Sequence, residues 1–122
     1  MRTDTVDEAC PTPDSAARQA ALASAFAVLG KPWSGLLIGA LLAGPSGFAR
    51  LSRAVAGISD RMLSTRLREL AAAGIVHRVV DEEPSRHATY VLTPRGQALG
   101  PALDTLARWG EGRILEGEPL WG

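Results

Sequence analysis

The sequence predicts a mainly α-helical fold that carries one small β-hairpin. Apolar side chains recur at spacings of three and four residues along most of the chain, which is the period of amphipathic helices. Two short segments, IVHRVV and TYVL, have the alternating or β-branched pattern of strands instead. The connection between them, DEEPSRHA, is charged and contains a proline, as expected of the turn in a two-stranded ribbon.

A chain of 122 residues is long enough for one small domain with its own core. Residues 1–14 contain two prolines and no hydrophobic period, so we expect a flexible N-terminal arm there. The structured domain is expected over residues 15–113, followed by a C-terminal tail over residues 114–122. No apolar run approaches the roughly 20 residues of a membrane helix, and the acidic N-terminus does not resemble a signal peptide. We therefore expect a cytoplasmic protein with no membrane partner.

Two helices are expected before residue 45. The first runs over residues 15–29, because a serine stands at its N-cap and a glycine follows its last apolar residue. Its apolar stripe consists of Leu22, Phe26 and Leu29. The second helix, over residues 33–43, is nearly all apolar and ends at Gly44-Pro45. Its length is that of a core helix.

The next two helices form a pair with a glycine in the turn between them. The third begins at Phe48, carries apolar residues at helical spacing and stops at Gly57. Ser59 is a good N-cap for the fourth helix, residues 59–73, which ends at Gly74. One face of the fourth helix consists of Leu63, Leu67 and Leu70. The pair has the dimensions of a helix-turn-helix unit, although pairs of this size also fill unrelated cores.

A charged two-stranded ribbon directly after a helix-turn-helix is the order of elements in a winged helix. We therefore predict a winged helix-turn-helix with extra N- and C-terminal helices. The last helix is expected from Thr93 and Pro94 to about Trp109, with threonine as the cap and proline at the first helical position. In the ribbon, the three consecutive acids at residues 81–83 are expected near the base and Arg86 near the tip.

The formal net charge is zero, but the charges are unevenly distributed. Residues 15–109 carry eleven basic and six acidic side chains, whereas both flanking segments are acidic. Within residues 50–68 there are five arginines and one aspartate, a local charge of +4. A basic patch on a neutral protein indicates a polyanionic partner, and double-stranded DNA fits a helix-turn-helix. A solvated helix face is the ordinary alternative.

The residues from Phe26 to Arg113 resemble the HxlR-type winged helix-turn-helix transcriptional regulators of bacteria. The run GISDRMLSTRLREL, with LTPRG downstream, carries this resemblance. It implies a homodimeric regulator that binds a palindromic operator, with a dimer made largely by the first and last helices, and we expect a repressor. Many relatives sense thiol-reactive compounds through a cysteine about thirteen residues before the tryptophan that corresponds to Trp33. Ala20 stands at this position here, and the single cysteine is Cys10.

The outward side of the fourth helix supplies the candidate reading residues. The side chains opposite the leucines are Arg61, Ser64, Thr65 and Arg68. Arginine pairs with the O6 and N7 of guanine in the major groove, and serine and threonine bond phosphates or base edges. Ser59 and the free amides of the first turn are placed to hold a phosphate, because a helix N-terminus attracts anions.

Other basic residues are expected at the edges of this interface. Arg50 and Arg53, on the preceding helix, suit phosphates that flank the groove. Arg86 and His87 in the ribbon are placed to reach a minor groove or the DNA backbone, and an ordinary solvent-exposed loop is an equal alternative. Arg66 lies between the two faces of its helix, so it is expected to pair with Asp60 or Glu69 or to reach a phosphate.

Two apolar stripes predict the dimer interface. The Ala-rich first helix and the last helix each present large apolar side chains that do not easily fit over one three-helix core. The residues concerned are Leu22, Phe26, Leu99, Leu103, Leu106 and Trp109. A two-fold partner would bury both stripes and match a palindromic operator. The alternative is that the stripes pack against each other within one chain.

The sequence offers little for catalysis or metal binding. The two histidines lie far along the chain from the cysteine, and no phosphate-binding glycine loop is present. We therefore expect no enzyme, cofactor or metal site. Two alternative functions are a winged-helix protein-interaction module with an acidic partner and a thiol-based redox sensor acting through Cys10. A small-molecule effector in an apolar pocket between the dimer helices is compatible with the main hypothesis.

Overall fold

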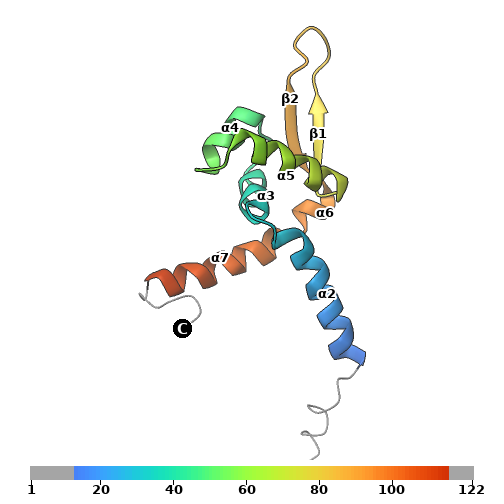
Figure 1. Cartoon of the computed structure of the whole chain (residues 1–122), viewed down its shortest axis with the longest axis vertical. Coiled ribbons are helices and arrows are strands. Elements are labelled where there is room, and N and C mark those ends of the chain that lie inside the picture. The colour runs from blue at the N-terminus through green and yellow to red at the C-terminus, as the bar shows by residue number, and fades with distance from the viewer. Residues whose placement is uncertain (1–12, 116–122) are drawn as a thin grey trace, which may run out of the picture. The chain divides into compact units, whose positions relative to one another are not determined.

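The computed structural model describes residues 13–115, which form six helices and one antiparallel hairpin (Figure 1). In chain order the elements are α2 (Pro13–Leu29), α3 (Ser34–Leu42), α4 (Phe48–Ala54), α5 (Asp60–Ala72), β1 (Val76–Val80), β2 (Ala88–Leu92), α6 (Pro94–Gln97) and α7 (Gly100–Leu115). The chain divides after Pro32 into two compact units, so α2 belongs to the first and the other elements to the second. The expected mainly helical fold with one hairpin is confirmed. The expected arm and tail lie almost wholly outside the described residues.

The core of the second unit is built by α3, α4, α5 and the base of the hairpin. Its buried apolar side chains are Leu37, Ile38, Leu41, Leu51, Val55, Ile58, Leu63, Leu67, Leu70, Ile75, Val76 and Leu92. α3 is thus the expected core helix, and the leucine face of the fourth helix is the buried face of α5. Burial of each leucine contributes about 1.5–3 kcal/mol. This core fixes which side of α5 faces solvent.

Both ends of α5 are determined by flanking residues. At the N-terminus, the Ser59 hydroxyl accepts a hydrogen bond from the Met62 amide at 3.0 Å, which confirms the expected cap. At the C-terminus, Gly74 has a φ of +77°, and the Ile75 amide donates to the Leu70 carbonyl at 2.9 Å. This is a Schellman motif, and Leu70 and Ile75 are both buried beside it. The chain therefore leaves α5 toward the hairpin with a defined geometry.

The hairpin is attached to the helices at its base. In the antiparallel pair, Val76 lies opposite Leu92 and Arg78 lies opposite Tyr90. Tyr90 also exchanges two backbone hydrogen bonds with Ser46, just before α4, at 2.8 and 3.1 Å. Val76 and Leu92 are buried in the core, whereas the hairpin beyond them projects from the helices (Figure 1).

Thr93 joins the end of the hairpin to the end of α5. Its hydroxyl donates to the Gly74 carbonyl at 2.6 Å and accepts from the Gly96 amide at 3.1 Å, so it also caps α6. Gly96 is buried, and a Cβ there would collide with the Ile75 carbonyl oxygen and come within 2.9 Å of Leu92 Cδ2. The threonine and the glycine of LTPRG therefore both hold the hairpin against α5.

The expectation of one last helix, ending near Trp109, is wrong. α6 and α7 are separate, with residues 98–99 between them, and α7 continues to Leu115. Pro101 has no amide proton, so it cannot donate to the Gln97 carbonyl, and its ring would crowd that carbonyl in a continuous helix. Proline is well tolerated in the first turn of a new helix, which is where the break places it.

Candidate nucleic-acid interface

α5 presents a polar face opposite its buried leucines. Arg61 and Arg68 are exposed, and Ser64 and Thr65 between them are half-buried. Since the buried residues of α5 recur every three or four positions, these four polar side chains lie on the outer side of the helix. Two arginines and two hydroxyl groups therefore share one solvent-facing surface, as their spacing in the sequence predicts.

Arg66 differs from the arginines on either side of it. Its side chain is only 12% exposed, and its Nη1 lies 2.9 Å from Oε1 of Glu69. Of the two carboxylates expected to pair with Arg66, Glu69 makes the ion pair. This guanidinium is committed to a contact within the same helix, so the outer face of α5 keeps Arg61 and Arg68 as its cations.

A groove of about 370 Å³ lies between α5 and the hairpin. It is lined by Ser64, Leu67, Arg68, Ala71, Arg78 and Tyr90. The side chains of Arg68 and Arg78 make no ion pair or hydrogen bond within the described part of the chain, and no carboxylate is among the lining residues. Two guanidinium groups therefore share one hollow with a serine hydroxyl and a tyrosine ring. Such a site attracts an anion.

Arg78 is a candidate that sequence reasoning missed. Val76, Arg78 and Val80 alternate on one face of β1, and Val76 is the buried end of that face. The alternation indicates that Arg78 points to the same side as a core residue. Only the docking of the hairpin shows that this side adjoins α5. The sequence alone therefore does not predict that Arg78 and Arg68 line the same groove.

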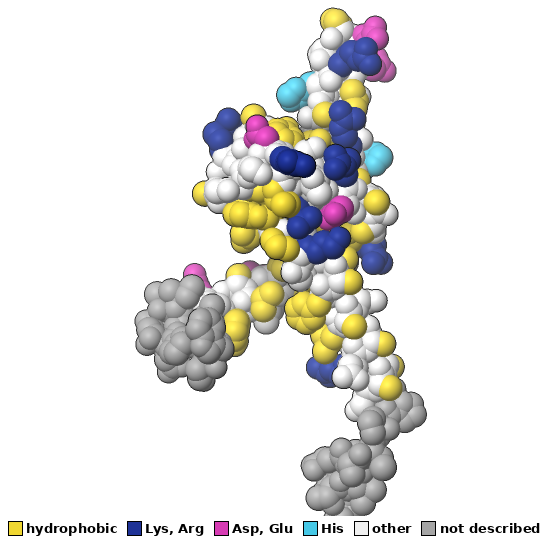
Figure 2. All heavy atoms as spheres, viewed as in Figure 1, with side chains coloured by type: hydrophobic (Ala, Val, Ile, Leu, Met, Phe, Trp, Pro, Cys, Tyr) yellow, Lys and Arg dark blue, Asp and Glu magenta, His cyan; other side chains and the backbone are white. Residues whose placement is uncertain are grey.

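Basic side chains gather over α5 and the adjoining part of the hairpin (Figure 2). Arg50 and Arg53, on α4, are both exposed. Ser59 is exposed at the start of α5, where its hydroxyl oxygen serves the helix cap. His87 lies beside the start of α4, because a Cβ on Gly47 would come within 3.3 Å of the His87 Nε2. These residues surround the α5 surface rather than lying on it.

The acids of the hairpin lie at its tip, so the expectation that they lie near its base is wrong. The last strand pair is Val80 with Ala88, and residues 81–83 therefore belong to the connection together with Arg86. The β-branched pair Val79-Val80 extends the strand up to these acids. Arg86 pairs with Glu83 at 3.3 Å in an exposed ion pair. The tip thus carries three acids and one already paired arginine.

The apolar residues expected at a dimer interface are largely exposed in the single chain. The exposed fractions are 50% for Leu22 and 59% for Phe26 on α2, and 51% for Leu106 and 54% for Trp109 on α7. Leu99 and Leu103 are half-buried. The other side of α7 carries an exposed ion pair between Arg108 and Asp104 at 2.9 Å. Clusters of large exposed apolar side chains mark association surfaces.

The remaining expectations concern the cysteine, metal ions and membranes. Cys10, the candidate redox residue, lies outside the described residues. Within residues 13–115, no group of three or more His, Cys, Asp and Glu side chains is placed to hold a metal ion. No single helix in this range is long and apolar enough to cross a membrane, and α2 and α3 meet that test only as a broken pair.

The stretch that contains the α5 surface matches known regulators. A family model described as HxlR-like helix-turn-helix matches residues 28–117, which include every element from α3 to α7. The chain belongs to the HxlR-like helix-turn-helix family. This HxlR-like protein is therefore a transcriptional regulator with a helix-turn-helix domain. The resemblance carried by GISDRMLSTRLREL and LTPRG is confirmed.

Similar proteins support the same assignment for the HxlR-like chain. The HTH-type transcriptional regulator YodB of Bacillus subtilis is 39% identical over 88 residues, which cover 72% of this chain and 79% of YodB. The reduced form of the redox regulator HypR superposes with a TM-score of 0.73 at 35% identity, covering 79% of this chain and 97% of HypR. The reduced form of B. subtilis YodB gives a TM-score of 0.69 at 33% identity, covering 88% of this chain and 98% of that chain. The winged helix-turn-helix fold is confirmed.

Proposed function

We propose that this protein is a homodimeric, sequence-specific DNA-binding regulator that represses transcription from a palindromic operator. The observation that carries the proposal is the basic surface of α5 and the hairpin, where Arg61 is exposed and unpaired Arg68 and Arg78 share one groove. Membership in a family of helix-turn-helix transcriptional regulators favours DNA over an acidic protein as the partner of this surface.

In this proposal α5 lies in the major groove of DNA. Arg61, in the first turn of α5, reads guanine, because recognition helices direct their N-terminal residues to base edges. Ser64 and Thr65, about one turn later, bond base edges or phosphates. Both are short and half-buried, so they let the helix backbone approach the bases closely.

The groove between α5 and the hairpin suits a backbone phosphate. Arg68 and Arg78 line it together with Ser64 and Tyr90, and hydrogen bonds from guanidinium to phosphate are strengthened by charge. Phosphate contacts position a protein on DNA without reading its sequence. We therefore assign Arg68 a positioning role, although its place on α5 alone suggested that it reads bases.

The remaining basic residues contribute unequally to this proposed complex. Arg50 and Arg53 are exposed on α4 and take phosphates beside the major groove, while Ser59 holds the start of α5 in place. Arg86 contributes little, because it is paired with Glu83 within an acidic tip that phosphate repels.

Two copies of the chain complete the proposed DNA-binding unit. The exposed apolar residues of α2 and α7 need a partner surface, and an isologous dimer supplies the same surface from a second copy. Such a dimer presents two α5 helices to half-sites separated by about 34 Å per helical turn of DNA. Occupation of an operator within a promoter blocks transcription there.

Gel-shift titration on the DNA that flanks the gene for this protein tests the proposal. The wild-type protein is expected to retard this DNA in preference to random duplex of equal length. Arg61→Ala should reduce the preference, because a lost bidentate contact to guanine costs about 1–3 kcal/mol of discrimination. Arg108→Ala is the matched control, since it removes an exposed arginine on the side of α7 away from the apolar stripe.

Three results would count against the proposal. Retardation without sequence preference, unchanged in both Arg61→Ala and Arg68→Ala, would remove α5 as the recognition helix. A protein that retards no DNA but captures an acidic protein would favour the interaction module. Expression of a reporter driven by the bound promoter should rise when the gene for the regulator is deleted. A fall in expression would show that the protein activates transcription instead of repressing it.

A further inference from the structure

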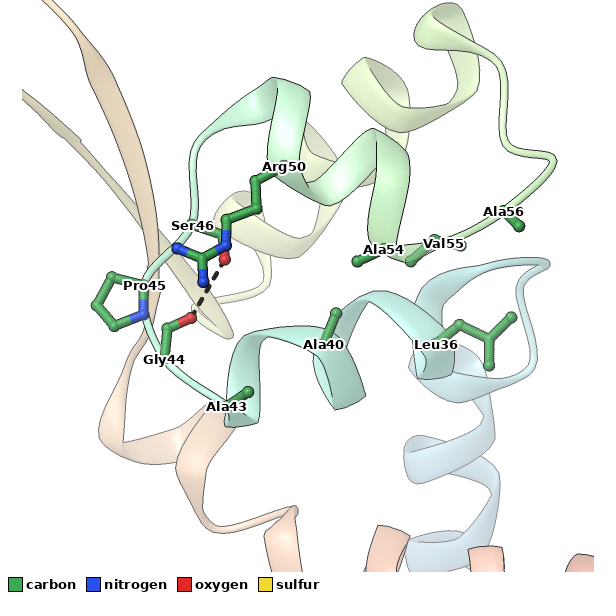
Figure 3. A pocket seen from close by; sticks show the side chains of 10 residues that line it. All are labelled: Leu36, Ala40, Ala43, Gly44, Pro45, Ser46, Arg50, Ala54, Val55 and Ala56. Carbon is green, nitrogen blue, oxygen red and sulfur yellow. Dashed lines mark hydrogen bonds between the residues drawn. The ribbon is translucent and has the colours of Figure 1, made fainter.

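A second groove lies between α3 and α4 (Figure 3). Its volume is about 440 Å³, within the range of small-molecule sites. About half of its surface is apolar, with Leu36 and Ala40 on α3, Ala43 directly after that helix, and Ala54 and Val55 at the end of α4. The small side chains on both helices leave the space between them open.

One end of this groove is positively charged. The Arg50 side chain reaches toward the loop that contains Gly44 and Ser46, and Arg50 is the one charged residue among those lining the groove (Figure 3). Among the described residues, the Arg50 side chain has no ion-pair or hydrogen-bond partner. The Ser46 hydroxyl donates a long hydrogen bond of 3.5 Å to the Gly44 carbonyl and is available to a better acceptor. At the other end, Leu36 is 63% exposed.

The dimensions of the groove restrict its occupant. Leu36 and Ala43 stand seven positions apart, which corresponds to about 10 Å along a helix. A guanidinium binds a carboxylate through two parallel charge-assisted hydrogen bonds, while the alanine and leucine walls suit hydrocarbon. The fitting ligand has one carboxylate and an apolar body of about that length.

We propose that the α3–α4 groove binds an apolar monocarboxylate, and that the bound carboxylate engages Arg50 and removes it from DNA. This inference rests on the proposed contact between Arg50 and a phosphate beside the major groove. Carboxylate and phosphate compete for the same guanidinium, so ligand and DNA weaken each other's binding by the same factor. A neutral molecule of the same shape fills the apolar part of the groove without competing.

Binding of 2-naphthoate to the full-length protein, in the absence of DNA, tests the site itself. 2-Naphthamide is the neutral isostere. Isothermal titration should show the acid binding roughly tenfold more tightly than the amide, and Arg50→Ala should abolish this difference. In the wild-type protein, naphthoate should shift the backbone amide signals of α3 and α4, which locates it without any substitution. Equal affinity for acid and amide, or shifts confined to the hairpin, would overturn the proposal.

A variant that fills the groove separates ligand binding from DNA binding. Ala54→Leu places a larger side chain among the lining residues and leaves Arg50 unchanged. It should bind naphthoate at least tenfold more weakly, whereas Ala17→Leu, at an exposed position of α2 outside the groove, should bind it as wild type does. Undiminished naphthoate binding by a folded Ala54→Leu protein would place the ligand elsewhere and refute the site.

Gel shifts with saturating naphthoate complete the test. The ligand should release DNA from the wild-type protein and from Ala17→Leu but leave the complex of Ala54→Leu intact. Normal DNA binding that naphthoate does not weaken would refute the competition at Arg50 while leaving the proposed function intact. A protein that binds naphthoate between α3 and α4 but retards no DNA would refute the proposed function, and the release step with it, while the ligand site would stand.

Discussion

Arginine side chains of equal charge differ in this protein because their surroundings differ. Arg66 is held against Glu69 and is mostly buried, whereas Arg68, two positions later, is exposed and lines a groove together with Arg78. Arg86 has a partner too, but an exposed ion pair contributes only about 0–1 kcal/mol. Whether an arginine can bind a polyanion therefore depends on how exposed its guanidinium is and on whether a carboxylate of the same chain already holds it.

Arg78→Ala is expected to weaken binding to the operator and to random duplex by the same factor. If Arg78 neutralises one phosphate, its loss should reduce the slope of log K against log salt concentration by about 0.9. Gel-shift or fluorescence titrations at several salt concentrations measure this slope. Arg61→Ala provides the contrast, because it should lower the operator affinity more than the random-duplex affinity. A selective loss of operator binding in Arg78→Ala would assign it to base reading instead.

Gly96→Ala should destabilise the protein by about 1–3 kcal/mol, because the added methyl group would overlap the Ile75 carbonyl and crowd Leu92. For a domain of this size each kcal/mol lowers the melting temperature by about 4–8 °C. Gly39→Ala is the matched control. It lies within α3 with no atom near the new Cβ, so it should stabilise the helix by about 0.5–1 kcal/mol. Melting curves at one protein concentration compare them, and an unchanged Gly96→Ala would contradict the contact.

At the scale of elements, the position of the hairpin against α5 results from three separate attachments. The Schellman motif sets the path of the chain out of α5, and the Thr93 hydroxyl joins that path to the start of α6. The backbone bonds between Ser46 and Tyr90 tie the hairpin to the segment before α4. The groove that holds Arg68 and Arg78 depends on this fixed position.

Thr93→Val should lower stability by about 1–3 kcal/mol, because it removes the hydroxyl that serves both Gly74 and Gly96 while keeping the shape of the side chain. Thr93→Ser keeps the hydroxyl and should lose much less. Urea denaturation of both variants gives the comparison. Equal destabilisation by valine and serine would attribute the effect to the methyl group and exclude the hydrogen bonds as its cause.

Local patterns in the sequence were sufficient to predict most elements of this fold. Ser59 and Gly74 mark the two ends of α5 in the sequence, because helix caps depend only on neighbouring residues. The spacing of the leucines in α5 also identifies which positions face outward. The signal for the break before α7 is local too, but Pro101 stands within an apolar stripe, Leu99, Leu103 and Leu106, whose spacing predicts an unbroken helix. The Arg68–Arg78 groove depends on where the hairpin docks, which no local pattern contains. Which residues contact DNA stays a prediction.

At the scale of the whole molecule, opposite sides of α7 differ in chemistry. Leu106 and Trp109 are exposed on one side, while Arg108 and Asp104 form an ion pair on the other. A helix that faced solvent all round would gain nothing from the exposed leucine and tryptophan. The asymmetry favours a second copy of the chain over a solvated α7, and it supports the proposed homodimer.

Leu106→Asp is expected to convert the proposed dimer into a monomer, because it would place a charge in the proposed apolar interface. Sedimentation equilibrium should show the change of mass, and binding to a full palindrome should weaken far more than binding to a single half-site. Arg108→Ala should remain dimeric. If Leu106→Asp sediments like the wild-type protein, the interface lies elsewhere.

The two backbone bonds between Ser46 and Tyr90 close the chain from before α4 to the end of the hairpin into one loop. In hydrogen-exchange terms, the amides of these two residues should exchange with solvent only when the unit as a whole opens. α5 lies inside this loop, so we expect it to move together with α4 and the hairpin. A regulatory signal would then move these elements as one body or act on side chains at their surface.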